Sequence, residues 1–441
     1  MSLSPKMQTS FINYFKADIE IKLFFLFLPF AYALQVLFFS KYMAVLPYIP
    51  LSFCIAKFIR DRVNRNIALE RSAGSPAFIP VMLFMATILY SVAIEAYSGS
   101  LGGMFKILLS LFLPLFVFFL AADGIFEETV TFLFNLIIAC AAVLALEELY
   151  EFLRTTPTIY EARNLLYIKA VTGELVERWG GETLRPGGLL DHVHAAPVFI
   201  GVGLLGSFFF YLHTSKTLYL LPIGVCVLGL VSSGMRLPVI ATFFTLFVLA
   251  LAQIKDILRA SARVRRLIYP LVISVLVVFV LYRCTRDMTR DMTLFWDFYS
   301  HPISTGELIP GKGFVKDVVV PQASETWRNM SGKWTSILFG YGLSTTRAIE
   351  KNVISDDVFT MYVLGGAGIL GTLIFYSLFA AAAYMFVKSV PGMDFERRHI
   401  LLFPAGIVLI LFISTFHSGI FIKRAIYPLF FLALGIAARY F

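Results

Sequence analysis

The sequence predicts an all-α integral membrane protein, a polytopic helical bundle of about twelve transmembrane helices. Of its 441 residues 59% are hydrophobic, and the mean hydropathy is +0.80. Soluble domains contain roughly 45–50% apolar residues. Charged residues make up only 15% of the chain and cluster between long apolar runs. Uninterrupted runs such as LFLPLFVFFLAA exclude a transmembrane β-barrel, whose strands alternate over stretches of about 10 residues.

Twelve apolar runs can each supply a membrane-spanning helix, which needs about 20 apolar residues. The predicted spans are 21–40, 43–59, 78–98, 104–123, 130–149, 195–212, 218–233, 238–254, 267–282, 358–387, 400–416 and 425–441. The run 358–387 is too long for one untilted helix. Its glycines Gly365, Gly366, Gly368 and Gly371 predict a break or close helix packing. We expect residues 1–441 to form a single transmembrane domain.

The distribution of Lys and Arg predicts the orientation of the spans. Basic residues concentrate in the tail before the first span, between spans two and three and between spans eight and nine. These segments share one side, which is therefore predicted to be cytoplasmic together with both termini. Two long segments, about 150–194 and 283–357, are then predicted to lie on the external side of the membrane. One cytoplasmic turn does not fit, because Asp123, Glu127 and Glu128 have no basic neighbour in sequence.

The formal net charge of +9 does not indicate a nucleic-acid partner. A soluble nucleic-acid-binding protein spreads Lys and Arg over a water-facing surface, and little of this chain can form one. The cysteines form no C-x-x-C pair and no Cys/His cluster. Neither a disulfide framework nor a metal site is therefore expected.

A stretch in the second external segment has the pattern of an amphipathic helix. Four apolar residues share one helical stripe: Trp327, Met330, Trp334 and Leu338. Ser324 is the predicted N-cap and Gly340 the predicted stop. The pattern fits a helix lying on the membrane surface or a lid helix packed on other helices.

Four polar motifs fall on the predicted external face. They are Arg185-Pro-Gly-Gly-Leu-Leu-Asp191-His192-Val-His194, Ser232-Ser233-Gly-Met-Arg236, Arg328 followed by Phe339-Gly340-Tyr341-Gly342, and Ser355-Asp356-Asp357. Spans six, eight and ten run inward, so each presents its helix N-terminus outside, and helix N-termini favour anions. Arginines beside such ends suit phosphate or pyrophosphate. Nearby carboxylates or imidazoles can accept a proton from a hydroxyl.

Each motif also has a structural interpretation. Arg236 can hold lipid phosphates at the interface, and Arg185 can stabilise a tight turn. Asp356 and Asp357 can cap a helix. The pair His192 and His194 can make loop hydrogen bonds.

These stretches resemble, in their order along the chain, the superfamily of O-antigen ligases and Wzy-type O-antigen or exopolysaccharide polymerases. The matching stretches are Leu184–Ala195, Ser232–Pro238, Thr326–Ser344 and Asp356–Gly371. The resemblance implies a metal-independent inverting glycosyltransferase without a cofactor. It would act on undecaprenyl-pyrophosphate-linked glycans at the periplasmic face of the bacterial inner membrane. It further implies that Arg236 and Arg328 hold the pyrophosphate with help from Arg185.

One departure from the family bears on the subtype. Ligases usually carry a His before the Gly-rich span, where this chain has Asp356 and Asp357. A carboxylate can do the same proton chemistry, and His192 and His194 are the alternative bases. The departure favours a repeat-unit polymerase over a ligase that transfers glycan to lipid A-core in lipopolysaccharide biosynthesis. Expected partners are lipid-linked glycans, the membrane and an assembly protein such as a chain-length regulator.

Two other classes of protein remain as alternatives. A transporter of lipid-linked oligosaccharide would place charged sites near the bilayer midplane, often in repeated halves. Most spans here are nearly free of charge and no repeat is visible. A non-catalytic scaffold of an assembly complex fits the hydropathy equally well, but predicts no penalty for replacing the arginines.

Overall fold

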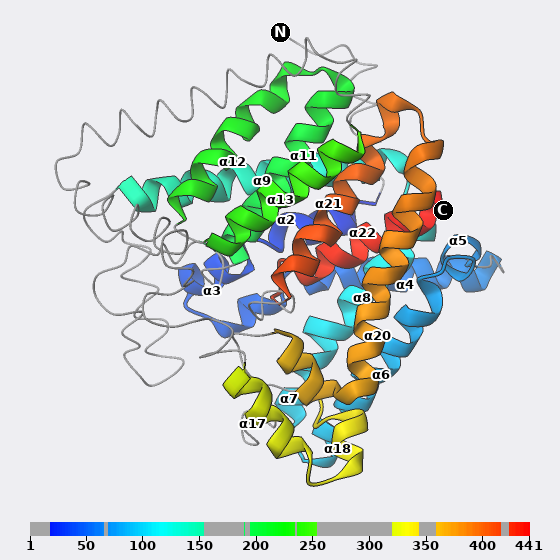
Figure 1. Ribbon diagram of the computed structural model, residues 1–441. Coiled ribbons are helices and arrows are strands. Elements are labelled where there is room, and N and C mark those ends of the chain that lie inside the picture. The colour runs from blue at the N-terminus through cyan, green and yellow to red at the C-terminus, as the bar shows by residue number, and fades with distance from the viewer. Residues whose placement is uncertain are drawn as a thin grey trace.

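The computed structural model describes residues 18–65, 69–153, 189, 195–233, 236–253, 320–343, 359–415 and 423–441, and every regular element within them is a helix (Figure 1). The α-helices are α2 (Ile19–Phe27), α3 (Ala31–Phe38), α4 (Tyr48–Arg65), α5 (Glu70–Ala73), α6 (Phe78–Tyr97), α7 (Leu101–Ile107), α8 (Leu113–Phe119), α9 (Glu127–Leu153), α11 (Ala195–Thr214), α12 (Leu220–Ser232), α13 (Arg236–Ala252), α17 (Val320–Met330), α18 (Trp334–Phe339), α20 (Phe359–Ser389), α21 (His399–Ser414) and α22 (Tyr427–Tyr440). Short 3-10 turns are η1 (Lys41–Val45), η4 (Thr217–Tyr219), η6 (Val390–Gly392) and η7 (Phe395–Arg397), and π-helical turns are η2 (Leu108–Phe112) and η3 (Leu120–Gly124).

Six helices in the described ranges are long and apolar enough to cross a membrane. They are Tyr42–Asn64, Phe78–Tyr97, Leu101–Gly124, Glu127–Tyr150, Ala195–Thr214 and Phe359–Gly392. The bent pair α2 and α3 makes a seventh if it counts as one span, and four further apolar helices are shorter. The prediction of a helical membrane protein agrees with this architecture. The predicted span 267–282 lies outside the described residues, and the total of twelve stays a prediction.

The first predicted span, 21–40, is not one straight helix. α2 and α3 meet at an angle of 66°. Pro29 lies in the break between them. Proline has no backbone N–H to donate, and its ring collides with the carbonyl four residues earlier. A bend at Pro29 therefore replaces the predicted continuous helix.

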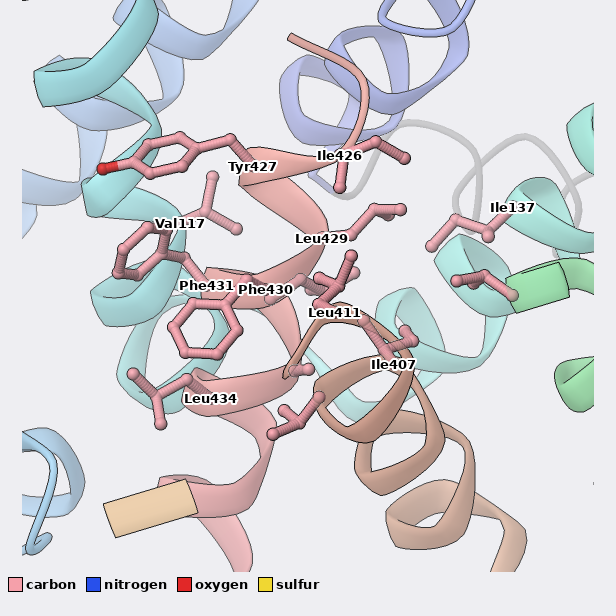
Figure 2. Packing of buried hydrophobic residues seen from close by; sticks show 14 of the residues in the cluster. Val117, Ile137, Ile407, Leu411, Ile426, Tyr427, Leu429, Phe430, Phe431 and Leu434 are labelled. Atoms are coloured by element: carbon pink, nitrogen blue, oxygen red, sulfur yellow. The ribbon is translucent and has the colours of Figure 1, made fainter. Parts of the chain in front are cut away.

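Small residues allow the helices at the centre of the bundle to pack closely. α11 is the most buried candidate span, with 94% of its apolar window inside the protein. A Cβ on Gly203 would lie 2.2 Å from the Cβ of Ala141 in α9, so the two backbones approach as closely as their side chains permit. Large side chains fill the neighbouring space. In Figure 2, Phe430 and Leu429 of α22 lie beside Leu411 of α21.

α20 reverses direction at Gly368. This residue has φ 68° and ψ −171°, which is not helical. The ring of Phe359 lies 5.3 Å from that of Phe375, and the Thr360 and Tyr376 hydroxyl oxygens are 2.6 Å apart. Residues sixteen positions apart in a straight helix would be separated by about 24 Å. The residues before Gly368 therefore form a short arm that folds back along the rest of α20.

The two ends of α6 define the two ends of the bundle. α6 begins next to α5, and we call this the α5 end. It finishes near α17 and α18, which lie together beside α7 in Figure 1, and we call this the α17 end. Ser91, in the last two turns of α6, accepts a hydrogen bond from the Leu343 N–H that follows α18.

The acidic turn that contains Asp123 and Glu127 has no basic neighbours in sequence. In the structure, basic residues of other helices contact it at the α5 end. The Asp123 carboxylate accepts hydrogen bonds from the backbone N–H groups of Arg71 and Ser72, both at 3.0 Å. The Arg62 guanidinium donates to the Asp123 carbonyl. The turn is therefore held against α4 and α5.

Two more arginines reach the same turn from the end of the chain. Arg397, before α21, forms an ion pair with Glu127. Arg439, in α22, donates to the Ile125 carbonyl at 2.6 Å. Arg62 and Arg71 lie between the second and third predicted spans, Arg397 lies between the tenth and eleventh, and Arg439 lies near the C-terminus. The predicted topology places all four on the cytoplasmic side.

Candidate functional site

Most predicted site residues lie outside the described residues. These are Arg185, His192, His194, Asp356 and Asp357. Arg236 opens α13, although its side chain is not described, and Arg328 lies in α17. The placement of the helix ends that carry the motifs is therefore the available test of whether the motifs share a site.

α11 and α13 begin at the same level. A Cβ on Gly201 would lie 2.2 Å from the Thr242 hydroxyl oxygen, and each residue is six positions from the start of its helix. Further along, Leu205 and Leu249 both lie next to Gly406 of α21. The two helices thus run in the same direction, and Arg236 opens α13 beside the start of α11.

α21 runs antiparallel to α11 and ends at this same level. The rings of His213 and His399 lie 6.2 Å apart at one end of the pair. Leu205 lies against Gly406 nearer the other end. Because both helices rise about 1.5 Å per residue, Thr415 after α21 reaches the level of Ala195.

The start of α20 joins these helix ends. The Thr360 hydroxyl donates to the Thr415 carbonyl, with 3.4 Å between the oxygens. Asp356 and Asp357 directly precede this arm in sequence. Three of the predicted motifs therefore open helices whose first turns meet around the end of α21.

These helix ends are buried inside the protein. Ala195, Ser233, Phe359 and Thr415 each expose 2% of their surface or less. The first turn of a helix carries N–H groups without an intrahelical acceptor, together with the positive end of the helix dipole. Helix starts gathered away from bulk water favour an anionic ligand.

The predicted Gly-x-Gly motif pairs with the Gly-rich span through its backbone. The Tyr341 N–H donates to the Gly365 carbonyl at 2.9 Å, and the Gly342 N–H donates to the Gly366 carbonyl at 2.7 Å. Gly340 has φ 70°, and a Cβ there would lie 2.4 Å from the backbone of Gly366. Only glycine combines this conformation with this approach. Both predictions for the Gly-rich run are confirmed, since it breaks and also packs closely.

Side-chain hydrogen bonds fasten the same segment to α17 and to the folded-back arm. The Tyr362 hydroxyl donates to the Leu343 carbonyl at 3.0 Å. The Tyr341 hydroxyl donates to the Asn329 carbonyl at 2.9 Å. Arg328, next to Asn329, is thereby held on an anchored helix at the α17 end, and its own side chain is exposed.

The predicted surface helix is interrupted. α17 begins at Val320, so Ser324 lies inside it and is not its N-cap. A turn at 331–333 containing Gly332 separates α17 from α18, since glycine is costly in a helix interior. Gly340 is the C-cap of α18, which confirms the predicted stop.

The apolar residues of this stretch do not share one face. Met330 is fully buried, whereas Trp327 is 50% and Trp334 80% exposed. The turn at Gly332 changes the helix direction, so the residues after it no longer continue the stripe before it. Buried Met330 fits the lid interpretation, and the two exposed tryptophans fit contact with the membrane interface.

From the sequence alone, Glu147 and Glu148 at the end of the fifth predicted span are interpreted only as markers of the membrane interface. The Glu147 carboxylate accepts a hydrogen bond from the Leu189 N–H at 3.2 Å. Leu189 belongs to the predicted motif that begins at Arg185. Its neighbour Glu148 is buried. The signal available in sequence is two acidic residues in succession at the end of an apolar run.

In the described ranges, no group of three or more His, Cys, Asp and Glu side chains is placed to hold a metal ion. Neither a scan of the sequence against protein-family models nor a search of curated proteins finds a match.

Proposed function

We propose that the protein is a polysaccharide repeat-unit polymerase of the bacterial inner membrane. It would be a metal-independent inverting glycosyltransferase that joins undecaprenyl-pyrophosphate-linked glycans at the periplasmic face. The observation that supports this most is the meeting of the first turns of α11, α13 and α20 in a buried region. Such a region suits a pyrophosphate, and each helix is opened or preceded by arginine, histidine or aspartate.

In the proposed reaction a hydroxyl of one lipid-linked repeat unit attacks the anomeric carbon of another glycan. The new glycosidic bond forms as the bond to the pyrophosphate oxygen breaks, with inversion at carbon. The hydroxyl proton passes to a side-chain base. Arg236 and Arg328, assisted by Arg185, stabilise the charge that develops on the leaving pyrophosphate.

The proposed orientation has twelve spans, both termini in the cytoplasm and the α17 end in the periplasm. It is supported by the arginines that meet at the α5 end, among them Arg62, Arg71, Arg397 and Arg439. Cytoplasmic ends of membrane proteins are enriched in such residues. The exposed Trp334 at the other end suits an interfacial position.

Asp357→Asn is expected to fold normally and to reduce glycan transfer at least about tenfold, because general-base assistance contributes about 10²–10⁴-fold. Asparagine keeps most of the capping ability of aspartate, whose loss would cost only about 0.5–2 kcal/mol of stability. Initial rates are measured on purified protein. If Asp357→Asn transfers normally while His192→Ala or His194→Ala does not, the base is an imidazole.

The decisive test of the function is reconstitution of the purified protein in liposomes with lipid-linked repeat units and a metal chelator. Ladders of longer glycan are expected. Transfer only when lipid A-core is added would identify a ligase. Movement of lipid-linked glycan across the bilayer without transfer would refute the enzyme and indicate a transporter, and no activity of either kind would favour a scaffold.

A further inference from the structure

A cavity of about 150 Å³ lies at the α5 end of the bundle, between α4 and the π-helical turn η3. Apolar side chains of both elements form part of its wall. The wall also contains five charged side chains, which are Asp18, Lys57, Asp61, Arg62 and Asp123. A cavity with this many charges near the end of a membrane-spanning helix suits a polar ligand and not a hydrocarbon chain alone.

Three of the five charged groups are engaged within the protein. Asp18 accepts hydrogen bonds from the Phe126 N–H at 3.1 Å and from the Thr129 hydroxyl at 2.9 Å. The Asp123 carboxylate is held by two backbone N–H groups of α5. The Arg62 guanidinium donates to the Asp123 carbonyl. These three side chains therefore shape the wall of the cavity.

The other two charged groups, Lys57 and Asp61, are one helical turn apart on α4. Among the described residues, the Lys57 ammonium has one ion-pair partner, Glu20, and the separation of 3.7 Å is too long for a hydrogen bond. One oxygen of the Asp61 carboxylate contacts the exposed Arg60 at 3.4 Å. An ammonium has three N–H donors, and a carboxylate accepts several hydrogen bonds. Both groups therefore retain hydrogen-bonding capacity toward a ligand in the cavity.

The position of these two groups along α4 gives their depth in the membrane. The apolar span that contains α4 ends at Asn64, so Asp61 lies near the membrane surface. Lys57 lies about 6 Å deeper, because each helical residue rises about 1.5 Å. Phe53 and Ile49 follow at the same spacing of four residues and are 66% and 48% exposed. From the membrane interior outward, this side of α4 presents two apolar groups, a cation and an anion.

We propose that this side of α4 and the adjoining cavity bind a phospholipid that has a primary amine in its headgroup, such as phosphatidylethanolamine. In this lipid the acyl chains, the phosphate and the ammonium follow one another in the matching order. Lys57 pairs with the phosphate, Asp61 accepts hydrogen bonds from the ammonium, and the acyl chains cover Phe53 and Ile49. Only 28% of the apolar window of this span is buried inside the protein, so lipid can reach it. The inference does not depend on the proposed glycosyltransferase.

The charges in the cavity wall favour this headgroup over two others. Three carboxylates face two cations, so phosphatidylglycerol would bring a further negative charge without a compensating cation. Phosphatidylcholine carries a trimethylammonium group, which has no N–H to donate to Asp61. Phosphatidylethanolamine is expected to bind at least about threefold more tightly than either lipid, because a half-exposed charge pair contributes a few-fold in affinity.

The test measures the binding of the palmitoyl-oleoyl forms of these three phospholipids to the purified full-length protein by native mass spectrometry. Soluble phosphoethanolamine is the fourth probe, since it has the same phosphate and amine without acyl chains. Lys57→Gln and Asp61→Asn are compared with Lys388→Gln and Asp394→Asn, which make the same changes at exposed residues outside the cavity. Thermal unfolding in detergent reports folding.

Asp61→Asn is expected to lose most of the preference for phosphatidylethanolamine over phosphatidylcholine while its affinity for phosphatidylcholine stays the same. Lys57→Gln should weaken both lipids by a similar factor of about three, because both contain the phosphate. The two control variants should bind like the unmodified protein. Phosphoethanolamine should bind much more weakly than the intact lipid, since it buries no apolar surface.

Equal or tighter binding of phosphatidylcholine or phosphatidylglycerol by the unmodified protein would overturn the proposal, and this comparison needs no variant to fold. A folded Asp61→Asn protein that keeps the full preference would overturn it as well. Phosphoethanolamine that binds as tightly as phosphatidylethanolamine would refute the lipid and indicate a soluble ligand with the same headgroup chemistry.

Discussion

Arg328→Ala is expected to lower glycan transfer by roughly 10²–10³-fold, because a charge-assisted contact to a transition-state oxyanion is worth about 2–4 kcal/mol. Arg236→Ala should have an effect of the same size. Arg328 is exposed on α17, so its loss should change the free energy of unfolding by no more than about 0.5 kcal/mol. Lysine should restore only part of the activity, since an ammonium lacks the bidentate fork.

Transfer rates are compared at equal amounts of folded protein in liposomes. Lys333→Ala is the matched control, since it removes an exposed cation from the turn that follows α17. It should leave transfer unchanged. Full activity in both arginine variants would reduce Arg236 and Arg328 to interfacial anchors.

Gly368→Ala is expected to destabilise the protein by at least about 2 kcal/mol. Its φ of 68° and ψ of −171° lie in a region that is open almost only to glycine and costs other residues about 1–3 kcal/mol. A Cβ there would also lie 2.3 Å from the Leu338 carbonyl oxygen, and overpacking adds about 1–3 kcal/mol. The measurement is thermal unfolding in detergent, supported by the amount of monodisperse protein.

Gly332→Ala provides the comparison for this substitution. No atom lies within 4 Å of a Cβ built on Gly332, and its φ is not in the left-handed region. It should unfold at the same temperature as the unmodified protein. A Gly368→Ala variant as stable as Gly332→Ala would contradict the reversal described for α20.

Hydropathy was sufficient to place the apolar helices that the structure describes, because each apolar run has to be buried in lipid or protein. It did not predict their bends. Pro29 was a visible signal for the break between α2 and α3. The reversal at Gly368 was only partly predictable, since four nearby glycines are compatible with either a break or close packing. The choice depends on Gly340 and Leu338, which are distant in sequence.

The candidate site was also predictable only in part. The motifs could be assigned to helix starts because turn residues and arginines stand next to apolar runs. The burial of Glu148 could not be predicted, because it depends on the axial register of α9 against α11 and α12. That register comes from contacts such as Gly203 with Ala141, which sequence periodicity does not reveal.

The arm of α20 before Gly368 folds back along the rest of the helix, which is the geometry of a re-entrant segment. The arm after Gly368 runs to Ser389 and extends about 31 Å, close to the roughly 30 Å of a bilayer hydrocarbon core. This arm therefore needs no steep tilt to match the bilayer. Irregular backbone at membrane depth is tolerated where protein covers it, and Tyr341 and Gly342 supply donors to the carbonyls near the break. In the proposed enzyme, the pyrophosphate can thus be bound below the lipid headgroups. The lipid-facing surface of the protein stays apolar.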